Sequence, residues 1–203
     1  MAGVPSAELL ERWTTRALTR AGVQICIRPL RPDDREREIA FINGLSDQSR
    51  YFRLMTPFKV LPRHLVDQLM DIDYSRRMAF VATVPTCSGE QFIGIARYGE
   101  TAEPGVAELA VSVADEWQRN GVARLLITQL LRFAQSHGVR RITGIVLPEN
   151  APMIGLAHSL GFAVALEPAQ HLITIDRELP ADVRGETRAV CGESPVSAVH
   201  PAH

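Results

Sequence analysis

The chain has 203 residues, of which 46% are apolar and 22% charged, with a formal net charge of −1 and a pI near 6.6. Such a chain can bury a core, and its balanced charge gives no reason to expect nucleic acid or an acidic membrane as a partner. No apolar run reaches the roughly 18 residues of a membrane span and no secretory signal opens the chain, so we expect a cytoplasmic protein. Widely spaced cysteines and histidines predict neither a disulfide framework nor a metal site.

The N-terminal part predicts one strand followed by helices. Residues 1–22 are ambiguous, because Trp13 and the preceding leucines have roughly helical spacing while residues 13–15 favour a strand and 20–22 suit a hairpin turn. We interpret them as an N-terminal extension. Residues 23–28 alternate between apolar and polar side chains and predict a strand. We expect a helix over residues 32–44 with Gly44 as its C-cap and another over residues 62–70. Between them, a short helix should begin at Ser46, which serves as its N-cap.

The rest of the chain predicts a sheet with one crossover. Its strands are expected over residues 78–84, 91–98, 108–113, 141–147 and 171–176, and its helices from about Arg124 to Gly138 and over 151–160. Because a helix crosses over between 108–113 and 141–147, these two strands should be parallel, whereas the earlier strands form an antiparallel meander. We therefore predict a mixed α/β fold with a central, mostly antiparallel sheet. It occupies one domain over residues 23–178, with a mobile tail over 179–203.

A strand, a short loop and a helix follow one another between Glu108 and Arg124. The loop Gln118-Arg-Asn-Gly-Val-Ala123 contains a single glycine and leads directly into a strongly amphipathic helix. Unpaired amides and the helix dipole favour an anion at such a helix N-terminus. The pattern predicts a phosphate-binding site.

Several motifs together resemble the Gcn5-related N-acetyltransferase (GNAT) superfamily. The loop at 118–123 fits its Gln/Arg-x-x-Gly-x-Gly/Ala pattern, and residues 150–162 look like its Asn-x-x-Met…Leu-Gly-Phe helix. Residues 27–34, 45–53 and 73–82 look like the catalytic domain of bacterial protein lysine acetyltransferases. The resemblance implies acetyl-CoA as acyl donor and a protein lysine as acceptor. The length accommodates the transferase alone, so we expect no fused regulatory domain, and a monomer or homodimer.

The resemblance also implies which residues hold the donor. The strands at 111–113 and 143–146 should splay apart around the pantetheine arm, with the loop on the pyrophosphate. Asn120 stands where close relatives often have a cation, which implies one phosphate contact fewer. The implied donor-binding residues are Val111, Ser112, Val113, Gln118, Arg119, Asn120, Gly121, Val122, Ala123, Arg124, Asn150 and Met153.

Glu108 is the residue that the resemblance implies as general base. It lies in an apolar run, so we expect it to be partly buried; the alternative is an outward-facing strand carboxylate. The tyrosine that usually serves as general acid is absent, because Ala157 occupies its position. Arg50, Tyr51 and Arg53 either shape the acceptor side or are core and surface residues, and Arg119 and Arg124 could be solvated surface cations. The remaining alternatives are a small-molecule amine acetyltransferase and a non-catalytic acyl-CoA-binding module.

Overall fold

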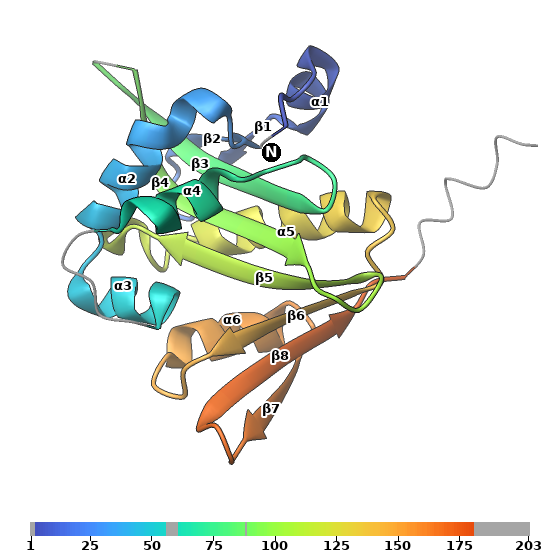
Figure 1. Ribbon diagram of the computed structural model, residues 1–203. Coiled ribbons are helices and arrows are strands. Elements are labelled where there is room, and N and C mark those ends of the chain that lie inside the picture. Colours follow the sequence, from blue (N-terminus) through green and yellow to red (C-terminus); the bar gives the residue numbers. More distant parts are fainter. Residues whose placement is uncertain (1–2, 56–60, 88, 181–203) are drawn as a thin grey trace, which may run out of the picture.

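The computed structural model describes residues 3–55, 61–87 and 89–180, so the tail predicted over 179–203 lies outside the described residues from 181 on. Within the described part, the chain forms one eight-stranded sheet in the order β1-β2-β3-β4-β5-β6-β8-β7 (Figure 1). The strands are β1 (Thr15–Leu18), β2 (Gln24–Pro29), β3 (Arg77–Thr86), β4 (Gly89–Glu100), β5 (Val106–Val113), β6 (Arg141–Val146), β7 (Ala163–Glu167) and β8 (Leu172–Glu178). The helices are α1 (Ala7–Trp13), α2 (Arg35–Gly44), α3 (Asp47–Leu54), α4 (Arg63–Met70), α5 (Val122–Ser136) and α6 (Ala151–Ser159), with 3₁₀ turns η1 (Pro32–Asp34) and η2 (Asp115–Trp117).

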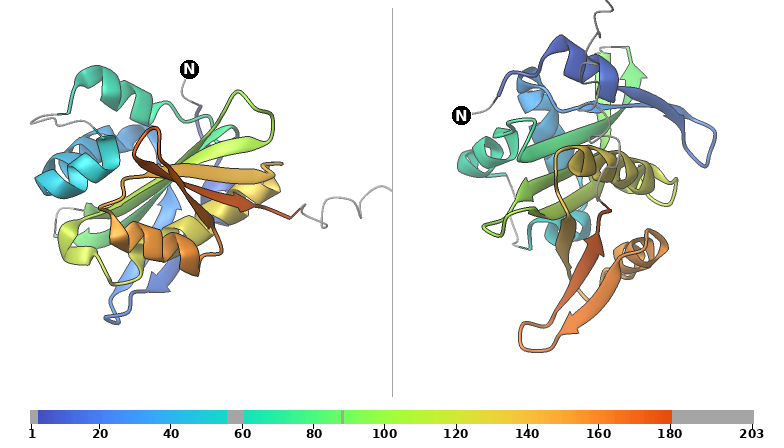
Figure 2. Two further views of the ribbon diagram at one scale, coloured as in Figure 1. Left: turned by 90° about the horizontal axis from the view of Figure 1, so that it is seen from below. Right: turned by 90° about the vertical axis from the view of Figure 1, so that its right-hand side faces the viewer.

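The predicted fold class is confirmed. Neighbouring strands pair antiparallel except β5 and β6, which are parallel and connected through the crossover helix α5. Helix α5 lies on one face of the sheet, while α2 and α4 lie on the other (Figures 1 and 2). The predicted apolar face of α5 is the one it buries, through Leu126, Leu130 and Phe133. Apolar surface is therefore removed from water between α5 and the central strands.

The ambiguous N-terminal residues form both a helix and a strand. Trp13, at the end of α1, packs edge-on against Phe133 of α5 with 5.0 Å between ring centroids, and its carbonyl accepts a hydrogen bond from Gln129. β1 pairs with β2 through a hairpin in which Gly22 adopts a positive φ of 78°. Residues 7–18 thus belong to the same layers as the rest of the sheet.

One strand was not expected, and two expected helix ends are wrong. β7 was not anticipated, because this edge strand leaves most of its residues exposed and lacks the alternation that marks a half-buried strand. Gly44 is the last residue of α2 rather than its C-cap, and the chain continues in extended backbone at Leu45 (φ −68°, ψ 146°). Helix α5 begins at Val122 instead of near Arg124, directly after Gly121.

A buried ion pair joins β2 to η1. The guanidinium of Arg28, 1% exposed, donates two hydrogen bonds to the Asp34 carboxylate, at 2.7 and 2.9 Å, and Glu90 accepts from it as well. The backbone amide of Arg31 also donates to Asp34. Every charge in this cluster is paired, as the low polarity of a protein interior requires.

Candidate active site

Strands β5 and β6 diverge as predicted. Their pairing runs only from Val106 opposite Arg141 to Glu108 opposite Thr143. A Cβ added to Gly144, the next residue of β6, would lie 3.1 Å from the carbonyl oxygen of Leu109, so glycine permits close approach where the divergence starts. Figure 1 shows the two strands meeting at one end and opening towards α3 and α6. Beyond Glu108, backbone groups on that side of β5 have no strand partner.

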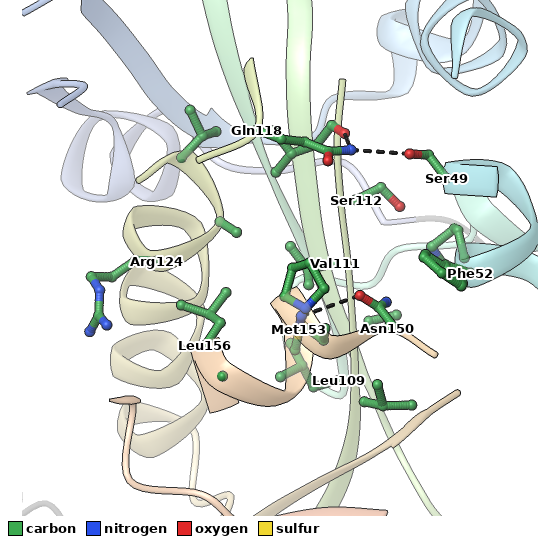
Figure 3. A pocket seen from close by; sticks show the side chains of 18 of the residues that line it. Ser49, Phe52, Leu109, Val111, Ser112, Gln118, Arg124, Asn150, Met153 and Leu156 are labelled. Atoms are coloured by element: carbon green, nitrogen blue, oxygen red, sulfur yellow. Dashed lines mark hydrogen bonds between the residues drawn. The ribbon is translucent and has the colours of Figure 1, made fainter. Parts of the chain in front are cut away.

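A cavity of about 850 Å³ occupies this opening. Its walls come from β5 and β6, from the loop before α5, and from α3 and α6 (Figure 3). The cavity brings together every site residue expected from the sequence except Asn120. These are Glu108, Val111, Ser112, Val113, Gln118, Arg119, Gly121, Val122, Ala123, Arg124, Asn150 and Met153.

The loop before α5 has the geometry of an anion-binding site. Arg119 and Gly121 both adopt positive φ, at 61° and 84°, so the backbone turns tightly twice within three residues. The amides of residues 119–124 have no hydrogen-bond acceptor in the described part of the chain. Successive unpaired amides of this kind form a concave donor surface for phosphate oxygens. The residues present therefore fit a diphosphate group.

The arginines at this end of the cavity differ in how far they are engaged. Arg124 donates to both the hydroxyl and the carbonyl oxygen of Ser159, which ties α5 to α6. Arg119 is exposed, and its side chain has no hydrogen-bond or ion-pair partner within the described residues. Arg20, which comes from the β1–β2 hairpin, also lines the cavity. Nothing in the sequence marks Arg20 as a site residue, because only the folded hairpin brings it to the loop.

Asn120 and Asn150 have structural contacts. The carbonyl of Asn120 accepts a hydrogen bond of 2.9 Å from the backbone amide of Arg20, so this residue connects the loop to the hairpin. The side-chain oxygen of Asn150 accepts from the amide of Met153 at 3.2 Å, which caps the N-terminus of α6 (Figure 3). This cap orients the first turn of α6 along the cavity.

A cluster of polar side chains connects the loop to α3. The carboxylate of Asp115 accepts hydrogen bonds from the hydroxyls of Ser46 and Ser49, each at 2.7 Å. Gln118 donates to Ser49 at 3.0 Å (Figure 3). These bonds hold the pKa of Asp115 below its ordinary value, although burial acts in the opposite direction. The hydroxyl oxygen of Ser112 is buried and has no hydrogen-bond partner within the described residues.

Glu108 is exposed, so the expectation of partial burial is wrong. It is the last residue of β5 that pairs with β6, and it lines the cavity. Its sequence neighbours are apolar, but the side chain of Glu108 is not covered, because β6 leaves β5 directly after the pair Glu108–Thr143. Ala157, by contrast, is fully buried, so no side-chain hydroxyl stands at that position.

Helix α3 contributes Phe52 and Arg53 to the cavity, whereas Tyr51 is exposed and does not line it. Burial lowers the pKa of Arg53 to about 10; the charge of Arg97 adds to this, and Glu38 and Glu108 oppose it. Arg53 therefore stays protonated at neutral pH. Of the three residues weighed on the acceptor side, Arg53 is the one that faces the cavity.

Within the described ranges, no group of three or more His, Cys, Asp or Glu side chains is arranged to hold a metal ion. No helix of that part of the chain is both long and apolar enough to cross a bilayer.

A splayed parallel strand pair with unpaired amides at the start of its crossover helix defines a protein that binds a long, phosphate-bearing ligand between two strands. Residues 46–162 match the family model described as Acetyltransferase (GNAT) family, and the chain belongs to this family. It is accordingly an N-acetyltransferase, of a family whose acyl donor is acetyl-CoA.

Comparisons with individual proteins agree. The chain is 40% identical over 156 residues to acetyltransferase PA5475 of Pseudomonas aeruginosa, which covers 77% of this chain and 84% of that protein. It is 27% identical over 186 residues to acetyltransferase Pat of Mycolicibacterium smegmatis, covering 84% of this chain and 54% of Pat, so it spans about half the length of that relative. The solved GNAT domain of S. lividans PAT superimposes with a TM-score of 0.76 at 29% identity, covering 83% of this chain and 98% of that domain.

Proposed function

We propose that this enzyme transfers the acetyl group of acetyl-CoA to the ε-amine of a protein lysine, with Glu108 as the general base. The observation that supports it most directly is the exposed Glu108 on the cavity wall, at the point where the pairing of β5 with β6 ends. Motifs that resemble those of bacterial protein lysine acetyltransferases add to this support. From this resemblance we also propose a cytoplasmic location and a monomeric or homodimeric state.

The donor half of the proposal assigns the diphosphate of acetyl-CoA to the unpaired amides of residues 119–124. The pantetheine arm then follows the free edge of β5 along residues 111–113. Backbone amides there bond to the arm and polarise the thioester carbonyl, which stabilises the negative charge that develops on its oxygen.

In the catalytic half of the proposal, Glu108 accepts the proton of the attacking amine. A lysine amine with a pKa near 10.4 is mostly protonated at pH 7, and freeing it costs about 4–5 kcal/mol. The amine nitrogen attacks the thioester carbon, Glu108 accepts the proton, and the carbon–sulfur bond breaks. Because Ala157 supplies no acid, the thiolate leaves unassisted or takes a proton from water. A thiol pKa of about 8.5 makes this tolerable.

The charge around the acceptor end favours a lysine over a polyamine. A polyamine site needs several carboxylates that are free of partners. Of the three carboxylates in the described wall, Glu108 interacts with the charge of Arg53, Asp115 accepts hydrogen bonds from Ser46 and Ser49, and Glu149 is exposed. A single protruding lysine needs only one base.

The acceptor assignment is tested by CoA release from acetyl-CoA with a panel of acceptors. The panel contains lysine-bearing peptides and proteins, polyamines, free amino acids and amine drugs. We expect release to depend on the peptides and proteins. Release with a small amine alone would replace the lysine proposal, and tight acetyl-CoA binding without release on any acceptor would indicate a non-catalytic acyl-CoA-binding module.

A further inference from the structure

The turn between β1 and β2 is held rigidly against the loop before α5. Within the turn, the Thr19 amide donates to the Val23 carbonyl at 2.9 Å and the Thr19 hydroxyl accepts from the Val23 amide at 3.1 Å. The backbone amide of Arg20 donates to the carbonyl of Asn120 at 2.9 Å. This contact crosses 100 residues of sequence and fixes where the side chain of Arg20 starts.

The side chain of Arg20 then runs alongside Gly121. A Cβ built on Gly121 would lie 3.6 Å from Cγ of Arg20 and 3.9 Å from its Nε, so the side chain of Arg20 borders the space next to Gly121. Arg20 is exposed and lines the cavity at its loop end. Its guanidinium has no hydrogen-bond or ion-pair partner in the described part of the chain. A free cation therefore stands next to the unpaired amides.

The other cations of the cavity are less available there. Arg124 is engaged by Ser159, and Arg53 lies on α3 at the opposite end, near Glu108. Position 120, within the loop, is a neutral asparagine whose side-chain amide donates to the Gln118 carbonyl. Among the described residues, Arg20 therefore stands beside Gly121 without a partner, and Arg119, two residues earlier in the loop, has none either.

We propose that Arg20 is a donor-binding residue that contacts a phosphate group of acetyl-CoA. Guanidinium groups bind phosphate oxygens through paired charge-assisted hydrogen bonds. Arg20 lies outside residues 46–162, the segment that matches the family, so the N-terminal hairpin supplies one wall of the donor site. The proposal rests on the donor half of the proposed function.

The test compares Arg20→Ala with Arg16→Ala. Arg16 lies on the same hairpin, in β1, is also exposed, and does not line the cavity. We expect Arg20→Ala to raise the Kd and the KM for acetyl-CoA about tenfold while kcat changes little, which is the usual cost of losing a charge-assisted hydrogen bond. Arg20→Lys should recover part of the affinity. Affinity equal to that of Arg16→Ala, or a fall in kcat alone, would overturn the assignment.

Binding calorimetry without acceptor separates this inference from the proposal on which it rests. If the unmodified enzyme does not bind acetyl-CoA, the donor site itself is refuted, and Arg20 with it. If the unmodified enzyme binds and Arg20→Ala binds equally well, only Arg20 is refuted. A parallel titration with 3′-dephospho-CoA identifies the phosphate: an effect of Arg20→Ala that disappears with this ligand assigns the 3′-phosphate, and one that persists assigns the diphosphate. Thermal melting of both variants should give similar midpoints.

Discussion

The carboxylate of Asp115 accepts hydrogen bonds from both the backbone amide and the hydroxyl of Ser46, at 2.9 and 2.7 Å, although the residues are 69 positions apart. The pair joins the N-terminus of α3 to the turn η2 that precedes the loop of α5. Because Gln118 also bonds to Ser49, α3 and the loop form one polar unit. Helix α3, which we propose to lie on the acceptor side, is thereby coupled to the residues proposed to hold the donor.

Replacing Asp115 by alanine should loosen both sides of the cavity together. Four donor groups would lose their acceptor, so we expect the KM values for acetyl-CoA and for the acceptor to rise about fivefold or more. Steady-state kinetics with each substrate varied in turn measures this. Glu116→Ala in the same turn is the control. A rise for only one substrate would show that the two sides are independent.

Replacing Glu108 by glutamine should remove the proton acceptor while keeping the shape of the side chain. We expect kcat/KM to fall roughly 100-fold or more, with loss of the acidic limb of its pH profile. Glu149→Gln, which changes another exposed carboxylate of the same cavity, should leave kcat/KM within about threefold. An unchanged profile for Glu108→Gln would remove this residue from the mechanism.

Replacing Gly121 by glutamate should abolish acetyl-CoA binding. The substitution adds a carboxylate beside the unpaired amides and forces a side chain into a residue with φ of 84°, which costs about 1–2 kcal/mol. Gly138→Glu, at the other end of α5, has a similar φ of 81° with nothing near its Cβ position. This control should lose comparable stability in a thermal melt yet bind acetyl-CoA normally. Retained affinity in Gly121→Glu would contradict the diphosphate assignment.

Replacing Gly94 by alanine should displace the N-terminus of α5. The new Cβ would lie 3.0 Å from a methyl carbon of Leu126 and 3.1 Å from one of Val122, and 3.2 Å from the carbonyl of Ser112. We expect a loss of about 1–3 kcal/mol in the free energy of unfolding, as for other overpacked cores, together with weaker acetyl-CoA binding. Gly99→Ala on the same strand has its nearest neighbour at 3.8 Å and should be tolerated.

The buried pair of Arg28 and Asp34 should make stability depend on pH in acid. Burial alone would raise the pKa of Asp34, but the hydrogen bonds and charge of Arg28 hold it below the ordinary value. The unfolded chain, with a carboxyl pKa of about 3.9, therefore binds the proton first. The stabilisation is fully present above about pH 4 and is lost as pH falls through the lowered folded pKa.

Urea unfolding between pH 2 and pH 7 measures this dependence. Asp34→Asn should cost about 3 kcal/mol at pH 7, because it leaves the buried Arg28 underpaired, and should flatten the acid decline. Asp33→Asn, which changes the neighbouring exposed carboxylate, should keep the decline. Equal curves for the unmodified protein and Asp34→Asn would show that other carboxylates cause the acid unfolding.

The sequence by itself determined most of the helices and strands, the parallel crossover and the loop before α5. These follow from information held within a few residues: the apolar period of α5, the serine cap of α3, and a glycine directly before a helix. The divergence of β5 and β6 was expected only through the family resemblance, and the strand pairing confirms it. Gln118, Arg119 and Gly121 lie where their spacing predicts, because a short loop leaves them little freedom.

Only the tertiary structure decided which distant groups meet at this site. Arg20 reaches Gly121 through the pairing of β1 with β2, and Asp115 reaches Ser46 through the packing of α3. Glu108 is exposed because β6 leaves β5 one residue later, and β7 exists because β8 offers it an edge. Each of these contacts depends on residues far away in the chain. Local hydrophobic periodicity and capping residues do not indicate which distant segments will pack together.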